Sequence, residues 1–318
     1  MKKITVNQPH STTVNQCFDL FVKSCIARGL AKETVKGYGV VFKIFCQKMG
    51  CKDTDIADIT PEFLEEFILR LQENGQRKEI TISTYIRQIR VFLYFAMDRG
   101  YLRKFKITVP RAEKQVKETY SQQELKALLF KPNIRECSFT IYKTWVLENY
   151  LLGTGNRISS ALNLKIKDID FDSYMITITK SKNRKGYLIP LSSTLANVLK
   201  EYLQYRGGCT EDYVFCDAYG GKGDRRTYQE HIREYNHMRG VSKTSAHLFR
   251  HTFAKNWILN DGDIFRLQKI LGHATLDIVK EYVNLYGVDL QNNFDRYNPL
   301  DHLIAGEQKK KIQIKRRG

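Results

Sequence analysis

Hydrophobic residues recur at helical spacing in four runs over the first hundred positions, and turn or cap residues separate the runs. Apolar side chains three and four positions apart are typical of amphipathic helices. Thr13 and Thr60-Pro61 are predicted caps, because a hydroxyl accepts from first-turn amides and proline fits the first helical position. The runs lie between Thr13 and Gly29, Val35 and Gly50, Thr60 and Leu71, and Ser83 and Gly100. Their short connections predict a compact all-α domain of four helices.

The spacing of hydrophobic residues changes once from helical to alternating in the second half of the chain. Ser121 and Glu124 form a capping-box pattern ahead of an apolar run, and a longer helix is predicted over residues 139–152. Between Ile169 and Leu191 the period becomes two and a basic turn interrupts it, which predicts a small antiparallel sheet. Helices resume at Thr194, near Tyr228 and from Ala246. The predicted fold class is therefore mainly α with one small antiparallel β-sheet, which makes the second domain α+β.

Residues 103–118 differ from both halves, with six basic residues, two acids, one proline and few large apolar groups. They are the predicted linker, and two interpretations stay open: a solvated spacer, or a strap that crosses a phosphate backbone. The second interpretation makes the basic side chains DNA contacts, namely Lys104, Lys106, Arg111 and Lys114. The predicted organisation is a helical domain at 12–102, the linker at 103–118, a second domain at 119–298 and a basic tail at 299–318.

The charge balance narrows the class of partner. Lys and Arg number 52 against 34 Asp and Glu, so the formal net charge is +18. Such an excess predicts a polyanionic partner, either nucleic acid or an anionic membrane surface. No apolar run approaches the roughly 18 residues that a membrane span needs, and the seven cysteines include no CxxC pair. We expect a cytoplasmic two-domain protein that binds nucleic acid and has no disulfide framework.

The sequence lacks the residues that several reaction classes require. The chain has no Walker-A loop and no GxGxxG motif, so no phosphate cradle for nucleotide-driven chemistry is evident. His247 and His251 have the spacing of a zinc-binding HExxH motif. Position 248 is leucine, however, so the general base of such a site is missing. A metal site is therefore not predicted there.

Four groups of cations and one tyrosine remain, in a fixed order along the chain. Arg157 follows a glycine-rich turn, Lys182 lies in the basic turn of the predicted sheet, and Tyr282 lies nine residues beyond His273. Each has a simpler explanation when taken alone. Arg157 could form a surface ion pair, Lys182 could be a solvated turn residue, and Tyr282 sits at helical spacing among apolar residues.

Taken in this order, the residues resemble the tyrosine recombinase family of phage integrase and Xer type. Its pattern of TG-x-R-[IV]-S, a basic turn lysine, H-x-L-R-H-T-F-A and L-G-H followed by tyrosine is matched at 154–159, 182, 247–254 and 271–282. Residues 30–38 (Leu-Ala-Lys-Glu-Thr-Val-Lys-Gly-Tyr) also look like the family's N-terminal domain. The resemblance runs from about residue 12 to 298. It implies a SAM-like core-binding domain followed by a tyrosine recombinase catalytic domain.

The resemblance also implies an active site. Its members are Arg157, Lys182, His247, Arg250, His273 and Tyr282. Two arginines would clamp the scissile phosphate and stabilise its pentacoordinate transition state, and the histidines would hydrogen-bond to it. A tyrosine hydroxyl with a pKa of about 10 needs this help to attack at neutral pH. The lysine would protonate the departing 5′ oxygen, with Lys180 and Lys185 as rivals of Lys182. Tyr286 is the nearest rival nucleophile.

The implied function is site-specific recombination through a 3′-phosphotyrosyl intermediate, without ATP, metal or cofactor. Integration or excision of a mobile element is our first interpretation. The alternatives are Xer-like dimer resolution, nicking-closing activity of the type IB topoisomerases, and a non-catalytic DNA-binding regulator. Expected partners are duplex DNA with paired half-sites and a homo-tetramer on it, with accessory proteins left open and no membrane. One departure is Ser160, where the family usually has an acid. No arm-binding domain is evident before residue 12.

Overall fold

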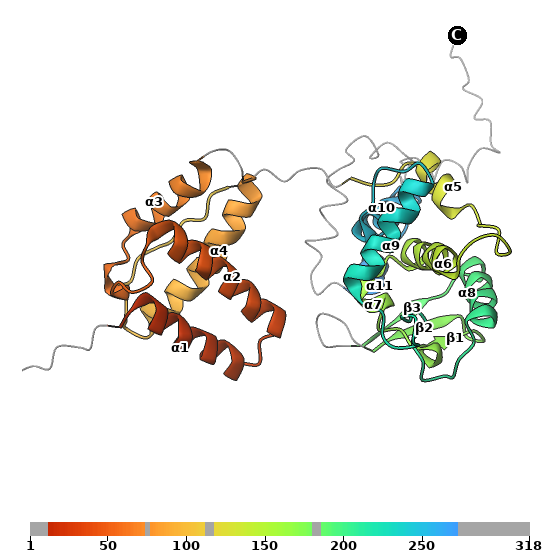
Figure 1. The fold of residues 1–318 in the computed structure, drawn as a ribbon, viewed down its shortest axis with the longest axis horizontal. Coiled ribbons are helices and arrows are strands. Elements are labelled where there is room, and N and C mark those ends of the chain that lie inside the picture. The colour runs from red at the N-terminus through yellow and green to blue at the C-terminus, as the bar shows by residue number, and fades with distance from the viewer. Residues whose placement is uncertain (1–11, 74–76, 112–117, 180–185, 273–318) are drawn as a thin grey trace, which may run out of the picture. The chain divides into compact units, whose positions relative to one another are not determined.

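The computed structural model describes residues 12–73, 77–111, 118–179 and 186–272. The chain divides into two compact units, with the boundary between Gln115 and Val116 (Figure 1). Each unit has its own hydrophobic core.

The described part of the first unit contains four α-helices, as the hydrophobic periodicity predicts. They are α1 (Val14–Ala27), α2 (Lys32–Met49), α3 (Pro61–Gln72) and α4 (Glu79–Asp98). Helix α4 packs against each of the other three. Aromatic rings fill the space between them: Phe18 stacks on Phe42 with centroids 3.7 Å apart, and Phe92 meets Phe18 edge-on at 5.3 Å. Ring pairs of this kind add to the free energy of burial.

The predicted caps form in the structure. Thr13 accepts from the Gln16 amide in a capping box, and Thr60 accepts from Phe63 with Pro61 at the first helical position. Helix α4 begins at Glu79, four residues before the predicted Ser83. Its N-cap residue makes no side-chain cap hydrogen bond. The start of α4 therefore has no cap signal in the sequence.

Residues 103–110 follow α4 and are called the extended segment here. They form no helix or strand and lie over the core of the first unit. Ile107 is buried in the core, and Phe105 and Val109 pack against the same core. Lys104 and Lys106 alternate with them and are exposed. Because this half of the predicted linker is packed, we propose that the linker proper begins after Val109.

The second unit is built around one central helix. Its described elements are α5 (Gln122–Leu129), α6 (Phe139–Thr154), α7 (Ile158–Ala161), β1 (Ile169–Asp170), β2 (Met175–Ile178), β3 (Tyr187–Pro190), α8 (Ser193–Arg206), α9 (Arg225–Met238), α10 (Ala246–Leu259) and α11 (Ile264–Leu271). Helix α6 contacts α5, α7, α8, α9 and α10. Its residues from Tyr142 to Glu148 are all buried, including the charged Lys143 and Glu148. These five helices are therefore positioned through their contacts with α6, while α11 packs against β3 and α10.

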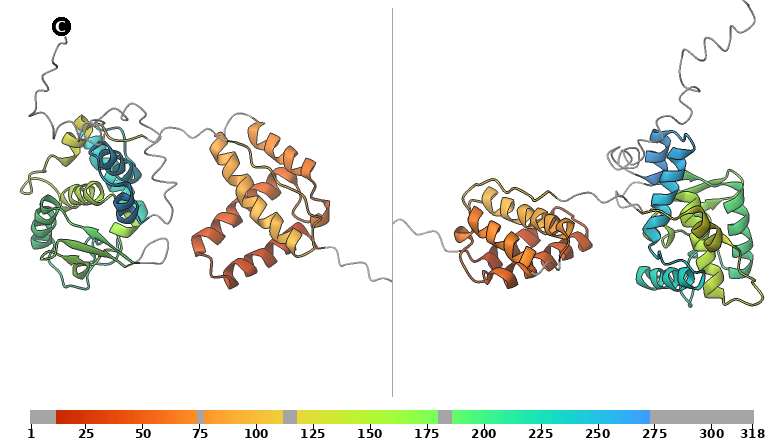
Figure 2. Two further views of the ribbon diagram at one scale, coloured as in Figure 1. Left: turned by 180° about the vertical axis from the view of Figure 1, so that it is seen from behind. Right: turned by 90° about the horizontal axis from the view of Figure 1, so that it is seen from above.

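The predicted sheet is confirmed as three antiparallel strands in the order β1-β2-β3 within the described residues. Ile176 pairs with Ile189, and Ile178 pairs with Tyr187. The isoleucine side chains are buried against the core while Leu188 is exposed, as a half-buried strand requires. Figures 1 and 2 show the sheet at one end of the unit and α5 at the other. The sequence-based fold class, mainly α with a small sheet, is confirmed.

No helix in the described ranges combines the length and the apolar character that a membrane crossing requires.

Candidate active site

Arg250 of α10 joins three segments that lie far apart in the sequence. Its guanidinium is buried and donates from Nη1 to the carbonyl of Gly155 at 2.9 Å and from Nη2 to the carbonyl of Leu271 at 2.8 Å. A buried guanidinium is costly unless its donors are used. The planar fork of arginine holds two donor nitrogens in a fixed geometry that matches two carbonyls at once, whereas lysine has a single donor nitrogen. One side chain thus holds together the turn before Arg157 and the turn before His273.

The turn before Arg157 depends on a glycine. Gly155 ends α6 with a φ of +62°, and a Cβ there would lie 2.5 Å from Phe253 Cδ1 and 2.8 Å from Leu271 Cδ2. Glycine alone combines this backbone conformation with so close an approach. Thr154 supports the turn, because its hydroxyl accepts from the Asn156 amide at 3.2 Å. Arg157 follows as the half-buried N-cap residue of α7.

Tyr187, the first residue of β3, belongs to the same cluster. Its hydroxyl donates to Asn156 Oδ1 at 3.0 Å, and Asn156 Nδ2 donates to Tyr150 Oη at 2.7 Å. Burial raises the pKa of Tyr187, while the positive charges of Arg250 and Arg157 and a hydrogen bond with Ser160 act to lower it. Tyr187 therefore lies within electrostatic reach of both arginines. Sequence reasoning assigned it only to a strand; its place directly after the basic turn was the available signal.

Ser160 replaces the acid that the family usually has, and the structure shows what it contacts. The residue is buried in α7, and its amide donates to the Arg157 carbonyl at 2.8 Å. Its hydroxyl lies close enough to the Tyr187 hydroxyl to act on it and lower the pKa of the tyrosine. A neutral hydroxyl pair thus occupies a position where the resemblance implies a carboxylate.

His247 lies one helical turn before Arg250 on α10. Its amide donates to Ser245 Oγ, the N-cap of the helix, at 3.3 Å. The ring is exposed, and it lies parallel to the ring of His251 with centroids 6.3 Å apart. Residues three apart share a helix face, so His247 and Arg250 face the same side of α10. The described residues contain no group of three or more His, Cys, Asp or Glu side chains arranged to hold a metal ion.

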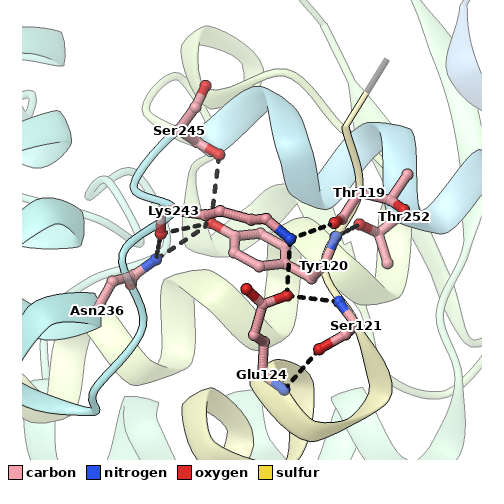
Figure 3. A network of polar contacts seen from close by, with 8 residues as sticks. All are labelled: Thr119, Tyr120, Ser121, Glu124, Asn236, Lys243, Ser245 and Thr252. Atoms are coloured by element: carbon pink, nitrogen blue, oxygen red, sulfur yellow. Dashed lines mark hydrogen bonds and ion pairs between the residues drawn. The ribbon is translucent and has the colours of Figure 1, made fainter. Parts of the chain in front are cut away.

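A polar network around Tyr120 fixes the start of α10 (Figure 3). The Tyr120 amide donates to Thr252 Oγ1 at 2.9 Å, and Asn236 Nδ2 donates to the Tyr120 hydroxyl at 3.1 Å. Lys243 Nζ donates to the Thr119 carbonyl and to Glu124 Oε2, both at 3.0 Å. This network anchors the helix that presents His247 and Arg250. Sequence reasoning missed it, because its members come from three separate segments.

The structure brings together part of the predicted site. Arg157, Arg250 and His247 lie on segments joined by the contacts above, and two of them surround Tyr187 with positive charge. Lys182 and its rivals Lys180 and Lys185 lie outside the described residues, as do His273, Tyr282 and Tyr286. Lys114 also lies outside them, whereas Lys104, Lys106 and Arg111 are exposed on the first unit. Both Arg157 and Arg250 act electrostatically on Tyr187, and guanidinium groups suit a phosphate ligand.

Two family profiles match the chain in sequence. The phage integrase family matches residues 119–287, and the phage integrase SAM-like domain matches residues 13–114. Tyrosine recombinase XerA of Pyrococcus furiosus is 30% identical over 206 residues, which are 62% of this chain and 68% of that protein. Tyrosine recombinase XerD of Chlamydia trachomatis is 26% identical over 301 residues, which are 92% of this chain and 97% of that protein.

Solved structures with the same fold include two integrases bound to DNA. The Tn1549 transposon integrase in complex with a circular intermediate DNA has a TM-score of 0.71 and 20% identity, covering 86% of this chain and 95% of that chain. A lambda integrase dimer bound to a COC′ core site has a TM-score of 0.69 and 17% identity, covering 85% of this chain and 95% of that chain. Both likenesses concern the fold.

Proposed function

Because the chain belongs to the phage integrase family, as a tyrosine recombinase that acts on DNA, we propose that it cuts and rejoins duplex DNA at specific sites through a 3′-phosphotyrosyl intermediate. The observation that supports this most is the pair of hydrogen bonds from buried Arg250 to Gly155 and Leu271. They bring together three segments that carry Arg157, His247 and Arg250 and lead to His273. The intact set of Arg157, Lys182, His247, Arg250, His273 and Tyr282 argues against a non-catalytic DNA-binding regulator.

The proposed reaction is a transesterification at one phosphate. Tyr282 Oη attacks the scissile phosphorus while His247 accepts its proton, and a covalent bond forms between the tyrosine and the 3′ phosphate. The bond to the 5′ oxygen breaks, and Lys182 gives that oxygen a proton. Arg157 and Arg250 neutralise the non-bridging oxygens, with His273 as a further donor. Rejoining reverses the step with a new 5′ hydroxyl, so no ATP is consumed.

The biological role has two candidates. We propose integration or excision of a mobile element as the first, in the cytoplasm and on nucleoid DNA. Xer-like dimer resolution is the second, and the relative named XerD that aligns with 92% of this chain favours it. The DNA that flanks the gene discriminates between them, because terminal repeats with cargo genes accompany mobile elements.

Covalent trapping tests the proposed function. Nicked suicide duplexes taken from the gene's own flanks are incubated with the whole chain in EDTA and separated on a denaturing gel. A protein–DNA adduct is the expected result. Salt-sensitive binding without an adduct, persisting over a randomised half-site library, would make the non-catalytic regulator the better description.

Affinity for DNA should depend steeply on salt through the exposed lysines of the extended segment. Each phosphate contact contributes about −0.9 to the slope of log K against log salt. Replacing both Lys104 and Lys106 by alanine should therefore flatten the slope by about 2 and weaken binding to all sequences alike. Fluorescence anisotropy over a salt series measures it.

A matched control changes the same charge elsewhere. Lys131 and Lys167 pair with Glu201 and Glu211 on the second unit, and their double alanine variant should leave the slope nearly unchanged. Equal slopes for the two double variants would remove the extended segment from the DNA interface.

The proposed assembly is a tetramer on two DNA sites, held by residues 288–304, which lie outside the described residues. The sequence of this segment predicts an amphipathic element, with apolar residues at Val288, Leu290, Phe294, Tyr297, Leu300, Leu303 and Ile304. Deleting residues 288–318 should abolish synapsis of two duplexes and spare binding to a single half-site, as measured by native gel shift. Deleting only 305–318 is the control and should preserve synapsis. Synapsis that survives the longer deletion would refute this role for the segment.

A further inference from the structure

Two backbone segments in the second unit are joined twice, at successive residues. One runs Gly155, Asn156, Arg157 and the other runs Leu271, Gly272, His273. Arg250 hydrogen-bonds to the carbonyl of the first residue in each segment. Tyr187 contacts the second residue in each, Asn156 and Gly272. The third residues are the ones to which the proposed function gives a phosphate contact.

The contacts of Tyr187 with the two segments differ in kind. On one side its hydroxyl donates to Asn156 Oδ1 at 3.0 Å, and Asn156 is itself held by Tyr150. On the other side its ring lies against Gly272, where an added Cβ would stand 2.9 Å from Cε1 and Cζ and 3.1 Å from Oη. Gly272 has a φ of +62°. Glycine therefore permits both this backbone conformation and the close approach of the Tyr187 ring. The tyrosine fits between the segments as a spacer with one directed hydrogen bond.

The hydroxyl is more than a by-product of packing. Phenylalanine would fill the same space as tyrosine. A half-buried hydroxyl therefore stabilises the fold only if its hydrogen bonds are satisfied. Here the hydroxyl lies near Asn156, Ser160 and the charges of both arginines. Ser160 occupies the position of the usual acid, so Tyr187 and Ser160 together supply the polar support that a carboxylate would otherwise give.

We propose that Tyr187 is a positioning residue for strand cleavage: its hydroxyl, through Asn156 and Ser160, fixes Arg157 relative to the backbone of Gly272, while Arg250 fixes the preceding residues. The inference rests on the proposed function, because it assigns Tyr187 a part in that reaction. Tyr187 does not touch the reacting atoms. Its effect passes through the placement of Arg157 and of the chain that leads to His273.

The experiment compares Tyr187→Phe with the parent chain in single-turnover cleavage of a suicide duplex. The variant keeps the ring against Gly272 and loses only the hydroxyl. Cleavage should slow by about 10- to 100-fold, since a displacement of about 1 Å at a reacting centre can cost about 10²-fold. DNA affinity should stay within about twofold, because a group that acts on the transition state changes the rate rather than ground-state binding. Both proteins are assayed where circular dichroism shows them fully folded.

Tyr174→Phe is the matched control. Tyr174 lies in the turn of the same sheet, and its side chain is exposed, so its variant should cleave at the parent rate. A second comparison places Tyr187→Phe in an Asn156→Ala background. If the hydroxyl acts through Asn156, the two changes are not additive and the added tyrosine change should alter the rate by less than about threefold.

The outcomes separate the inference from the proposed function. An adduct that forms at the same rate in the parent and in Tyr187→Phe overturns the inference and leaves the recombinase proposal intact. Cleavage and DNA affinity that fall together, or fully additive losses in the double variant, show a general structural role and also overturn it. A parent chain that forms no adduct on any library member overturns the proposed function, and the inference with it.

Discussion

Tyr282→Phe is expected to abolish the covalent protein–DNA adduct and to leave binding to the same duplex unchanged. The substitution removes the oxygen that would form the bond to phosphorus and nothing else. Loss of a covalent nucleophile lowers turnover by factors of about 10⁴ or more in enzymes that form a covalent intermediate. The adduct should therefore fall below detection on a denaturing gel at every time point.

Tyr286→Phe is the control for this prediction. Tyr286 lies four residues further along the sequence, so it is the nearest rival nucleophile. Its variant should form the adduct at the parent rate, in EDTA as in magnesium. An adduct that persists in Tyr282→Phe and disappears in Tyr286→Phe would move the nucleophile to the second tyrosine. An adduct lost only in EDTA would contradict the metal-free reaction.

Arg250→Met is expected to lower the cleavage rate by about 10³-fold and also to reduce the free energy of unfolding. One lost phosphate donor accounts for about 10²- to 10³-fold. In addition, the carbonyls of Gly155 and Leu271 lose their partner, and each buried acceptor left unpaired costs about 1–3 kcal/mol. Single-turnover cleavage and thermal unfolding measure the two effects separately.

Arg239→Met separates catalysis from stability. Arg239 also donates to a backbone carbonyl, that of Phe130 at 2.8 Å, and lies over the Phe130 ring. Its variant should lose stability and keep the cleavage rate. Arg250→Lys is the second comparison: a lysine cannot reach both carbonyls in a fixed fork, so it should remain at least about 10²-fold slow despite its charge. A lysine variant close to the parent rate would show that charge alone is needed.

Local signals in the sequence were enough to predict most helices. The hydroxyls of Thr13, Thr60 and Ser121 cap α1, α3 and α5 as expected, because a cap hydrogen bond spans only three residues. Helix α4 starts earlier than predicted, since its first turn has no such side chain. Strand β1 has only two residues, too few for an alternating pattern to be recognised.

The sequence predicts the candidate site as a set of residues, but it does not predict how they are arranged. Order along the chain identified Arg157, His247 and Arg250, because motif residues keep their spacing. The contacts that gather them join positions about a hundred residues apart, as from Arg250 to Gly155. Tyr187 and Tyr120 were missed for the same reason. Their partners come from other segments, and a strand or a helix boundary explains each of them when it is considered alone.

The packed segment after α4 has a consequence for the entropy of DNA binding. Ordering a free chain costs about 1–2 kcal/mol per residue, and a flexible basic spacer would meet that cost each time it bound. Ile107 and its neighbours fix the backbone between Lys104 and Val109 when the first unit folds. In the DNA contact that we propose for them, Lys104 and Lys106 are therefore preorganised, and more of their attraction to phosphate would remain as affinity.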